Sequence, residues 1–185
     1  MNSPNLIRTK YLALTALLLT AAVILSIVEG MLPSLSVVAP GVRLGLSNIP
    51  VMYALFFLEK KQAFTVAVLK SGFVFLTRGA TAGILSFCGG MLSIAVMIVL
   101  MRFNKKASYT AISISGAVAH NMGQLAVSSI IYIGFNMIFY LPPLAAAGVA
   151  AGALTATVLR CAMPALERMN KLKWVAPIPQ SGRRK

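Results

Sequence analysis

The chain has 185 residues, of which 58% are hydrophobic and 11% are charged, and its mean hydropathy is +0.85. A soluble domain carries about 25% charged residues and must face water with much of its surface, so this composition excludes an ordinary soluble fold and indicates lipid as the surrounding solvent. The formal net charge of +14 would suggest nucleic acid in a soluble protein, but here the basic residues stand between apolar runs and are expected to set the topology, with no nucleic-acid partner.

Six apolar segments predict membrane-spanning helices, since about 20 such residues are needed to cross the hydrocarbon core. They cover residues 11–32, 44–58, 62–78, 82–101, 109–133 and 141–163. The second segment is short and contains Pro50, which predicts a broken or tilted outer end. The sequence therefore predicts an all-α, six-helix transmembrane domain over residues 1–170. A basic cytoplasmic tail, expected to be disordered, follows over residues 171–185.

The distribution of Lys and Arg predicts the orientation of these spans, because cytoplasmic loops carry an excess of both residues. With the N-terminus inside, six spans leave only Arg43, Lys70 and Arg78 of the 17 basic residues in the membrane interior or outside. A wrong number of spans would scramble this partition. The count therefore favours six spans with both termini in the cytoplasm.

Small residues recur at helical spacing in the first and last spans. Gly148 and Gly152 form a GxxxG pattern, which lets two helix backbones approach closely in lipid. We expect this pair to form a packing seam rather than a ligand site. In the first span, Ala13, Ala16 and Thr20 share one face. That face is predicted to be either an internal seam or a docking surface for another membrane protein.

Polar side chains within the spans are candidates for a functional site, because a charge near the bilayer centre costs on the order of 3 kcal/mol or more unless it finds a partner. Lys70 and Arg78 lie on the same side of the third span, with Arg78 about 12 Å further outward. His120 and Gln124 are one helical turn apart and share a face of the fifth span. The candidates are Glu29, Arg43, Asn48, Lys70, Arg78, His120, Asn121 and Gln124.

Nearly all of these candidates fall in the outer half of the membrane or at its midplane, which predicts one polar cavity that opens outward. Arg43, Lys70 and Arg78 oppose one carboxylate, Glu29, so the cavity would favour a substrate that bears a carboxylate or phosphate. The alternatives are a Glu29–Lys70 ion pair, two arginines that reach the outer headgroups, and a His120 that only joins helices. One His and two separated Cys offer no metal-binding set, and neither a metal nor a cofactor is expected.

Three segments resemble the Gx transporter family, whose members are often labelled heptaprenyl diphosphate synthase component I. They are Pro40-Gly-Val-Arg-Leu-Gly-Leu-Ser-Asn-Ile-Pro50, Leu69-Lys-Ser-Gly72 and Gly116-Ala-Val-Ala-His-Asn-Met-Gly-Gln124. The resemblance covers roughly residues 10–165. That family is in turn similar to the substrate-binding (S) components of energy-coupling factor (ECF) transporters, in which six helices bind a vitamin or related small molecule from outside.

The resemblance implies an ECF S-component bundle in a bacterial inner or plasma membrane, which docks on a transmembrane T component driven by two ATPases. It implies that Pro33–Val42 gates the pocket and that the small face of the first span meets the T component. An Ala-xxx-Ala pattern is typical at this place. Here Ala16 is its first residue, and Thr20 stands in place of the second Ala. The pocket residues that the resemblance implies are Arg43, Asn48, Lys70, His120, Asn121 and Gln124.

The label of a synthase is not expected to describe the chemistry of this chain. Prenyl diphosphate synthases hold Mg²⁺-diphosphate through Asp-rich motifs, whereas this chain has no Asp and its only acids are Glu29, Glu59 and Glu167. We therefore expect a binding subunit without catalytic activity. The alternatives are a non-catalytic membrane subunit in isoprenoid, menaquinone or redox assembly, and a membrane enzyme.

Overall fold

The computed structural model describes residues 4–31, 45–104, 107–131, 139 and 141–171, and describes their side chains except at 4–8, 10, 159 and 162–171. Within this part of the chain there are six α-helices and one 3-10 helix, which confirms the all-α prediction. Arg43, the predicted gate Pro33–Val42 and the predicted tail beyond Lys171 lie outside the described residues.

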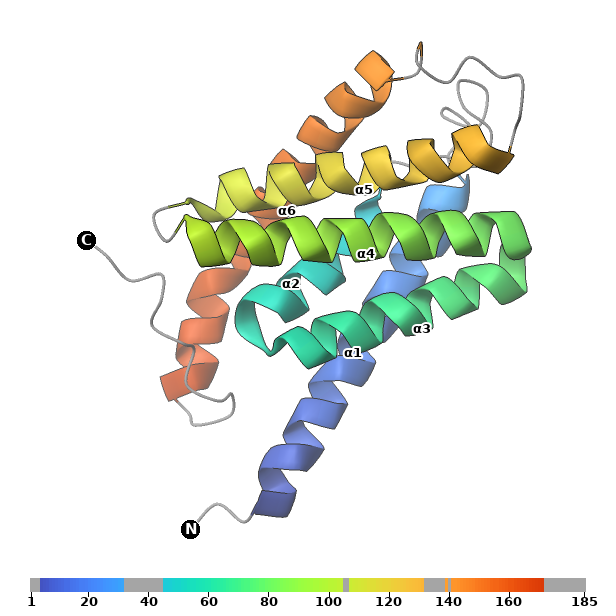
Figure 1. Ribbon diagram of the computed structural model, residues 1–185. Helices are drawn as coiled ribbons and strands as arrows, with labels where there is room; N and C mark the ends of the chain where they lie inside the picture. The colour runs from blue at the N-terminus through green and yellow to red at the C-terminus, as the bar shows by residue number, and fades with distance from the viewer. Residues whose placement is uncertain (1–3, 32–44, 105–106, 132–138, 140, 172–185) are drawn as a thin grey trace.

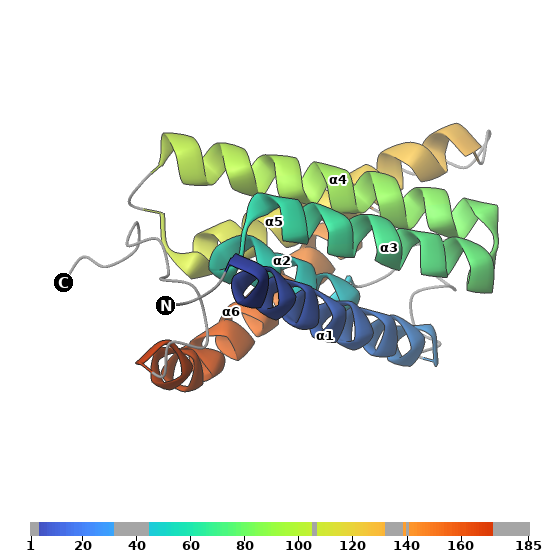
Figure 2. The same ribbon diagram turned by 90° about the horizontal axis from the view of Figure 1, so that it is seen from below.

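A helix occupies most of each of the six apolar segments. The elements are α1 (Pro4–Met31), the 3-10 helix η1 (Leu46–Asn48), α2 (Ile49–Phe57), α3 (Lys60–Arg78), α4 (Ala80–Phe103), α5 (Tyr109–Ile131) and α6 (Leu141–Lys171). Helices α3, α4 and α5 lie side by side and alternate in direction, while α1, α2 and α6 cross on one side of this layer (Figures 1 and 2).

Three of the described helical stretches are long and apolar enough to cross a membrane: Tyr11–Met31, Ala80–Phe103 and Leu141–Val158. They identify the chain as a membrane protein. Helices α3 and α5 carry buried polar groups such as Lys70 and His120. On the face of a helix that points into the bundle, such groups can be held where lipid would reject them.

The short helix α2 forms the centre of the apolar core. Its side chains are hydrophobic on all sides of the helix, and most of them are buried, as expected for a helix that other helices surround. Pro50 stands in its first turn, where the missing N–H costs no helical hydrogen bond. The ring of Phe56 meets Tyr109 of α5 edge to face, with centroids 5.3 Å apart. The N-terminal part of this segment forms the separate 3-10 helix η1.

Glycines permit the close approach of α4, α5 and α6. A Cβ added at Gly123 would lie 3.0 Å from the Cα of Gly89. Added at Gly148, it would lie 3.0 Å from the Cα of Val118, and at Gly152 it would collide with the backbone of Ile114. Gly148 and Gly152 therefore form the seam between α6 and α5, as their spacing predicts.

The two ends of the bundle differ in character. Lys60 and Lys61 start α3 and Arg102 lies in the last turn of α4, and all three are exposed at one end. Helix α1 begins and α6 ends toward this same end (Figure 1). At the opposite end, Gly79 alone connects α3 to α4 with a φ of +90°, a conformation that favours glycine.

Candidate functional site

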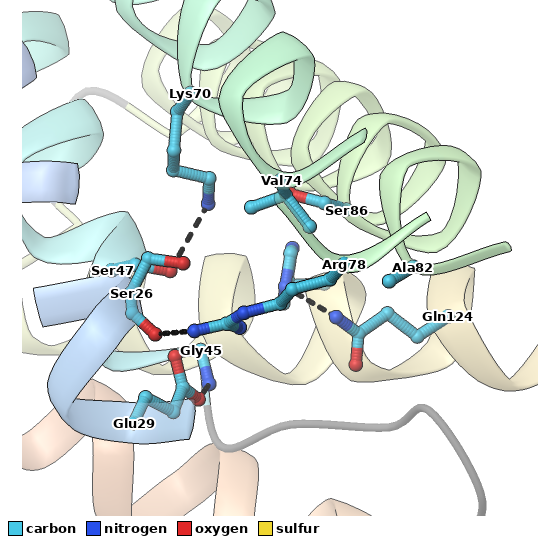
Figure 3. A pocket seen from close by; sticks show the side chains of 11 residues that line it. Ser26, Glu29, Gly45, Ser47, Lys70, Val74, Arg78, Ala82, Ser86 and Gln124 are labelled. Carbon is cyan, nitrogen blue, oxygen red and sulfur yellow. Dashed lines mark hydrogen bonds between the residues drawn. The ribbon is translucent and has the colours of Figure 1, made fainter. Parts of the chain in front are cut away.

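One pocket lies between α1, η1, α3, α4 and α5, toward the end of the bundle opposite the exposed basic residues (Figure 3). It is lined by Ser26, Glu29, Gly45, Ser47, Lys70, Val74, Arg78, Ala82, Ser86, His120 and Gln124. On each α-helix these residues are spaced by three or four positions, the spacing that places side chains on one face. Each helix therefore presents one face to the pocket.

Lys70 is the central cation of this site and is only 1% exposed. Its ammonium donates to the Oδ1 of Asn48 and, over 3.3 Å, to the Oγ of Ser47. Both acceptors belong to η1, at the start of the α2 segment. Lys70 thus links the middle of α3 to η1 through neutral oxygen atoms, and no carboxylate lies within ion-pair distance of it among the described residues.

Arg78 and Glu29 connect the C-terminal end of α1 to its neighbours. The Nη2 of Arg78 donates to the backbone carbonyl of Ser26, while its Nη1 is buried and has no hydrogen-bond partner. The carboxylate of Glu29 accepts a hydrogen bond from the backbone N–H of Gly45. Glu29 therefore fixes the start of η1, and Arg78 holds α3 against α1.

His120 lies between two glycines that leave room for its ring. A Cβ at Gly89 would be 2.8 Å from the Nδ1 of His120, and a Cβ at Gly45 would be 3.1 Å from its Cδ2. The Nε2 of His120 lies 3.0 Å from the amide Nε2 of Gln124. Because an amide NH₂ only donates, the ring nitrogen accepts and the imidazole is neutral. Its Nδ1 is buried without a partner.

The pocket is small in this conformation. The centre of a water molecule can occupy about 10 Å³ of it, which is close to the space for a single water molecule. A vitamin-sized molecule would require its walls to separate. Chemically, the lining that the structure describes offers two cationic donors, one carboxylate and a neutral histidine. No three His, Cys, Asp or Glu side chains lie together in the described part of the chain to hold a metal.

The structure brings together five of the eight residues predicted from the sequence: Glu29, Lys70, Arg78, His120 and Gln124. Asn48 lies behind this group as a partner of Lys70 and is 3% exposed. Asn121 faces away from the pocket, because its Nδ2 donates to the carbonyl of Leu144 in α6 at 2.8 Å. Arg43 lies outside the described residues.

Three residues of the predicted docking face, Ala13, Ala16 and Thr20, are exposed on α1. Within the described residues this face therefore does not form an internal seam. The alternative of a direct ion pair between Glu29 and Lys70 is not realised, since each binds a different partner of the η1 region.

Sequence reasoning missed the groups that position the site. The hydroxyl of Ser47 accepts a hydrogen bond from the ammonium of Lys70. The signal for this residue in the sequence was a hydroxyl next to Asn48 in an otherwise apolar stretch. The role of Gly89 as a neighbour of His120 could not be read from the sequence, because it depends on which faces of α4 and α5 meet.

A family model described as heptaprenyl diphosphate synthase component I matches residues 18–161, well over half of the chain. The chain belongs to this family. The matched range includes every residue that lines the pocket, from Ser26 to Gln124. The description names one component, so a member of the family is expected to work with a partner component. No curated protein and no solved structure matches the chain.

Proposed function

We propose that this protein is the substrate-binding membrane subunit of an ECF-type importer, and that its substrate is a small anionic molecule, such as a vitamin-like compound or one related to flavins or quinones. In this proposal the six helices cross a bacterial inner or plasma membrane in the manner of an ECF S component. Both termini lie in the cytoplasm, and the pocket opens to the outside.

The observation that carries the proposal is the convergence of Lys70, Arg78, Glu29 and His120 on one pocket between apolar helices. Buried charges in lipid are costly and mark substrate paths or sites more often than they add stability. A purely structural ion pair would place Lys70 against Glu29, whereas these two groups bind the η1 region separately. This separation leaves cationic donors directed at the pocket.

A binding role without catalysis fits the composition of the chain. There is no Asp in the sequence, and within the described part of the chain Glu29 is the one Glu that lines the pocket. Mg²⁺-diphosphate chemistry uses several carboxylates as hard oxygen ligands. The chain also has no GxxxxGK[ST] phosphate loop, so the energy for transport would come from two ATPase subunits.

The exposed small face of α1 supports docking on a T component. Ala13, Ala16 and Thr20 are all exposed, and Thr20 turns its hydroxyl onto the carbonyl of Ala16 at 3.0 Å. This bond satisfies the hydroxyl within α1 and leaves a shallow surface. Such a surface lets a second helix approach closely in a membrane, where packing drives association.

The family description favours one alternative function. It names a component of heptaprenyl diphosphate synthase, so this protein could instead be a non-catalytic membrane subunit of isoprenoid or menaquinone synthesis. The two proposals predict different partners. The first expects a T component with two ATPases, and the second expects the catalytic subunit of a prenyl synthase.

Affinity purification of the tagged protein from its native membrane, followed by mass spectrometry, tests both proposals. Recovery of a T component and two ATPases, together with a small anion carried through detergent, supports the importer. Recovery of a prenyl synthase catalytic subunit alone contradicts it. A control purification with Ala16→Leu should retain the small anion and lose the T component.

The proposed orientation can be tested at the two ends of α4, where Ala80 and Phe103 are both exposed. In a background with Cys88→Ser and Cys161→Ser, a membrane-impermeant maleimide applied to intact cells should label Ala80→Cys and not Phe103→Cys. Labelling of Phe103→Cys alone would reverse the orientation, and labelling of neither site until the cells are opened would contradict an outward pocket.

A further inference from the structure

Lys70 and Arg78 each keep a hydrogen-bond donor that has no partner among the described residues. An ammonium can donate to three acceptors, and Lys70 has two, on Ser47 and Asn48. A guanidinium donates from both terminal nitrogens. Arg78 uses Nη2 for the carbonyl of Ser26, whereas its Nη1 is buried without a partner. Both residues extend from α3 toward the pocket (Figure 3).

The charge balance of the pocket is the second observation. Of the described residues that line it, Lys70 and Arg78 are cationic, Glu29 is anionic, and His120 is neutral in its hydrogen bond with Gln124. The described lining of the pocket therefore carries one positive charge in excess. An uncompensated charge is unfavourable among apolar helices. A ligand with one negative charge balances this excess, whereas a phosphate or diphosphate overshoots it.

The geometry points to a carboxylate. We infer that Lys70 and the free Nη1 of Arg78 bind the carboxylate of a monoanionic substrate, with Glu29 as the fixed countercharge that disfavours phosphates and diphosphates. This inference rests on the proposed function in taking the pocket as the substrate site, and it narrows the substrate to carboxylic acids. It also separates the ligand from the diphosphate named in the family description.

Under this inference, Glu29 determines whether the pocket prefers a singly or a doubly charged anion. Replacing Glu29 with Gln keeps an oxygen that accepts from the N–H of Gly45, while it removes one negative charge. The pocket of Glu29→Gln then carries one more positive charge and should prefer a dianion. Glu59→Gln is the matched control, because Glu59 is exposed between α2 and α3 and does not line the pocket.

The test measures the binding of acetate, acetamide and methyl phosphate to the purified full chain in detergent, from the shift of the thermal midpoint at constant ionic strength and pH 8. These probes are far smaller than a vitamin, so the walls of the pocket need to separate less to admit them. At this pH acetate is a monoanion, acetamide is its neutral analogue, and methyl phosphate is a dianion because its second pKa is about 6.

We expect wild-type protein and Glu59→Gln to bind acetate at least about tenfold more tightly than methyl phosphate, a difference of about 1.4 kcal/mol, and to show no shift with acetamide. Glu29→Gln should change the acetate-to-phosphate ratio by about tenfold or more toward methyl phosphate. Lys70→Met should lose both anions, which keeps the test decisive if Glu29→Gln fails to fold.

Three results would overturn the inference: methyl phosphate bound by wild type at least as tightly as acetate, acetamide as effective as acetate, or no binding of any probe. An unchanged ratio in folded Glu29→Gln would also overturn it. A preference for methyl phosphate, with the T component and ATPases still copurifying, would refute the carboxylate inference and leave the importer proposal standing. A preference for acetate without those partners would refute the importer proposal alone.

Discussion

The two adjacent glycines of α4 provide a matched pair of substitutions, because only one of them contacts the site. A methyl group at Gly89 would stand 2.8 Å from the Nδ1 and 2.9 Å from the backbone oxygen of His120. The ring has little room to retreat, since even a Cβ at Gly45 would lie 3.1 Å from its Cδ2. At Gly90, the nearest atom to an added Cβ is the Cβ of Ala67 at 3.9 Å, an ordinary contact.

The expected magnitudes follow from these distances. Both glycines lie inside α4, so replacing either with Ala gains about 0.5–1 kcal/mol of helix stability. Gly90→Ala should keep this gain. Gly89→Ala must also separate α4 from α5, and overpacking of this kind costs about 1–3 kcal/mol. Because the helix-propensity gain cancels between the two variants, their free energies of unfolding should differ by about 1–3 kcal/mol.

The free energy of unfolding can be measured by titration from a mild detergent into SDS, with circular dichroism as the signal. Ligand binding by the same variants gives a second readout, since a displaced His120 changes the wall of the pocket. We expect Gly89→Ala to lose both stability and binding and Gly90→Ala to keep both. If Gly89→Ala proves as stable as Gly90→Ala, then α4 does not meet His120 as described.

Three further substitutions separate the site from its surroundings. Lys70→Met should abolish binding of the copurified anion in folded protein. The control Lys61→Met, at the exposed start of α3, should leave this binding intact. Unchanged affinity in Lys70→Met would show that Lys70 is not part of the site. Asn121→Ala should lower the free energy of unfolding by about 1 kcal/mol without loss of binding, because its amide bonds Leu144 in α6; a selective loss of binding would return Asn121 to the pocket. Ala16→Leu should keep the thermal midpoint of the isolated protein and lose copurification of the T component, and retained copurification would contradict docking on this face.

Helical periodicity correctly indicated which of the predicted residues share a face, while their role as a site stays a prediction. Lys70 and Arg78, like His120 and Gln124, are spaced so that they point the same way, and both pairs line the pocket. Asn121 follows His120 directly in the chain, so it points about 100° further round α5 and meets α6. Adjacency in sequence was a poor guide here, because consecutive residues on a helix do not share a face.

The composition and the apolar runs by themselves determined that this is an all-α membrane protein, since a chain with so few charges has to bury its backbone polar groups in helices when lipid surrounds it. The three motifs also determined the family. Only the tertiary structure decided that Glu29 binds the N–H of Gly45 rather than the ammonium of Lys70. The physical reason is that a charged side chain takes whichever partner the packing of α1, η1 and α3 brings within reach, and that packing depends on contacts spread over the whole bundle.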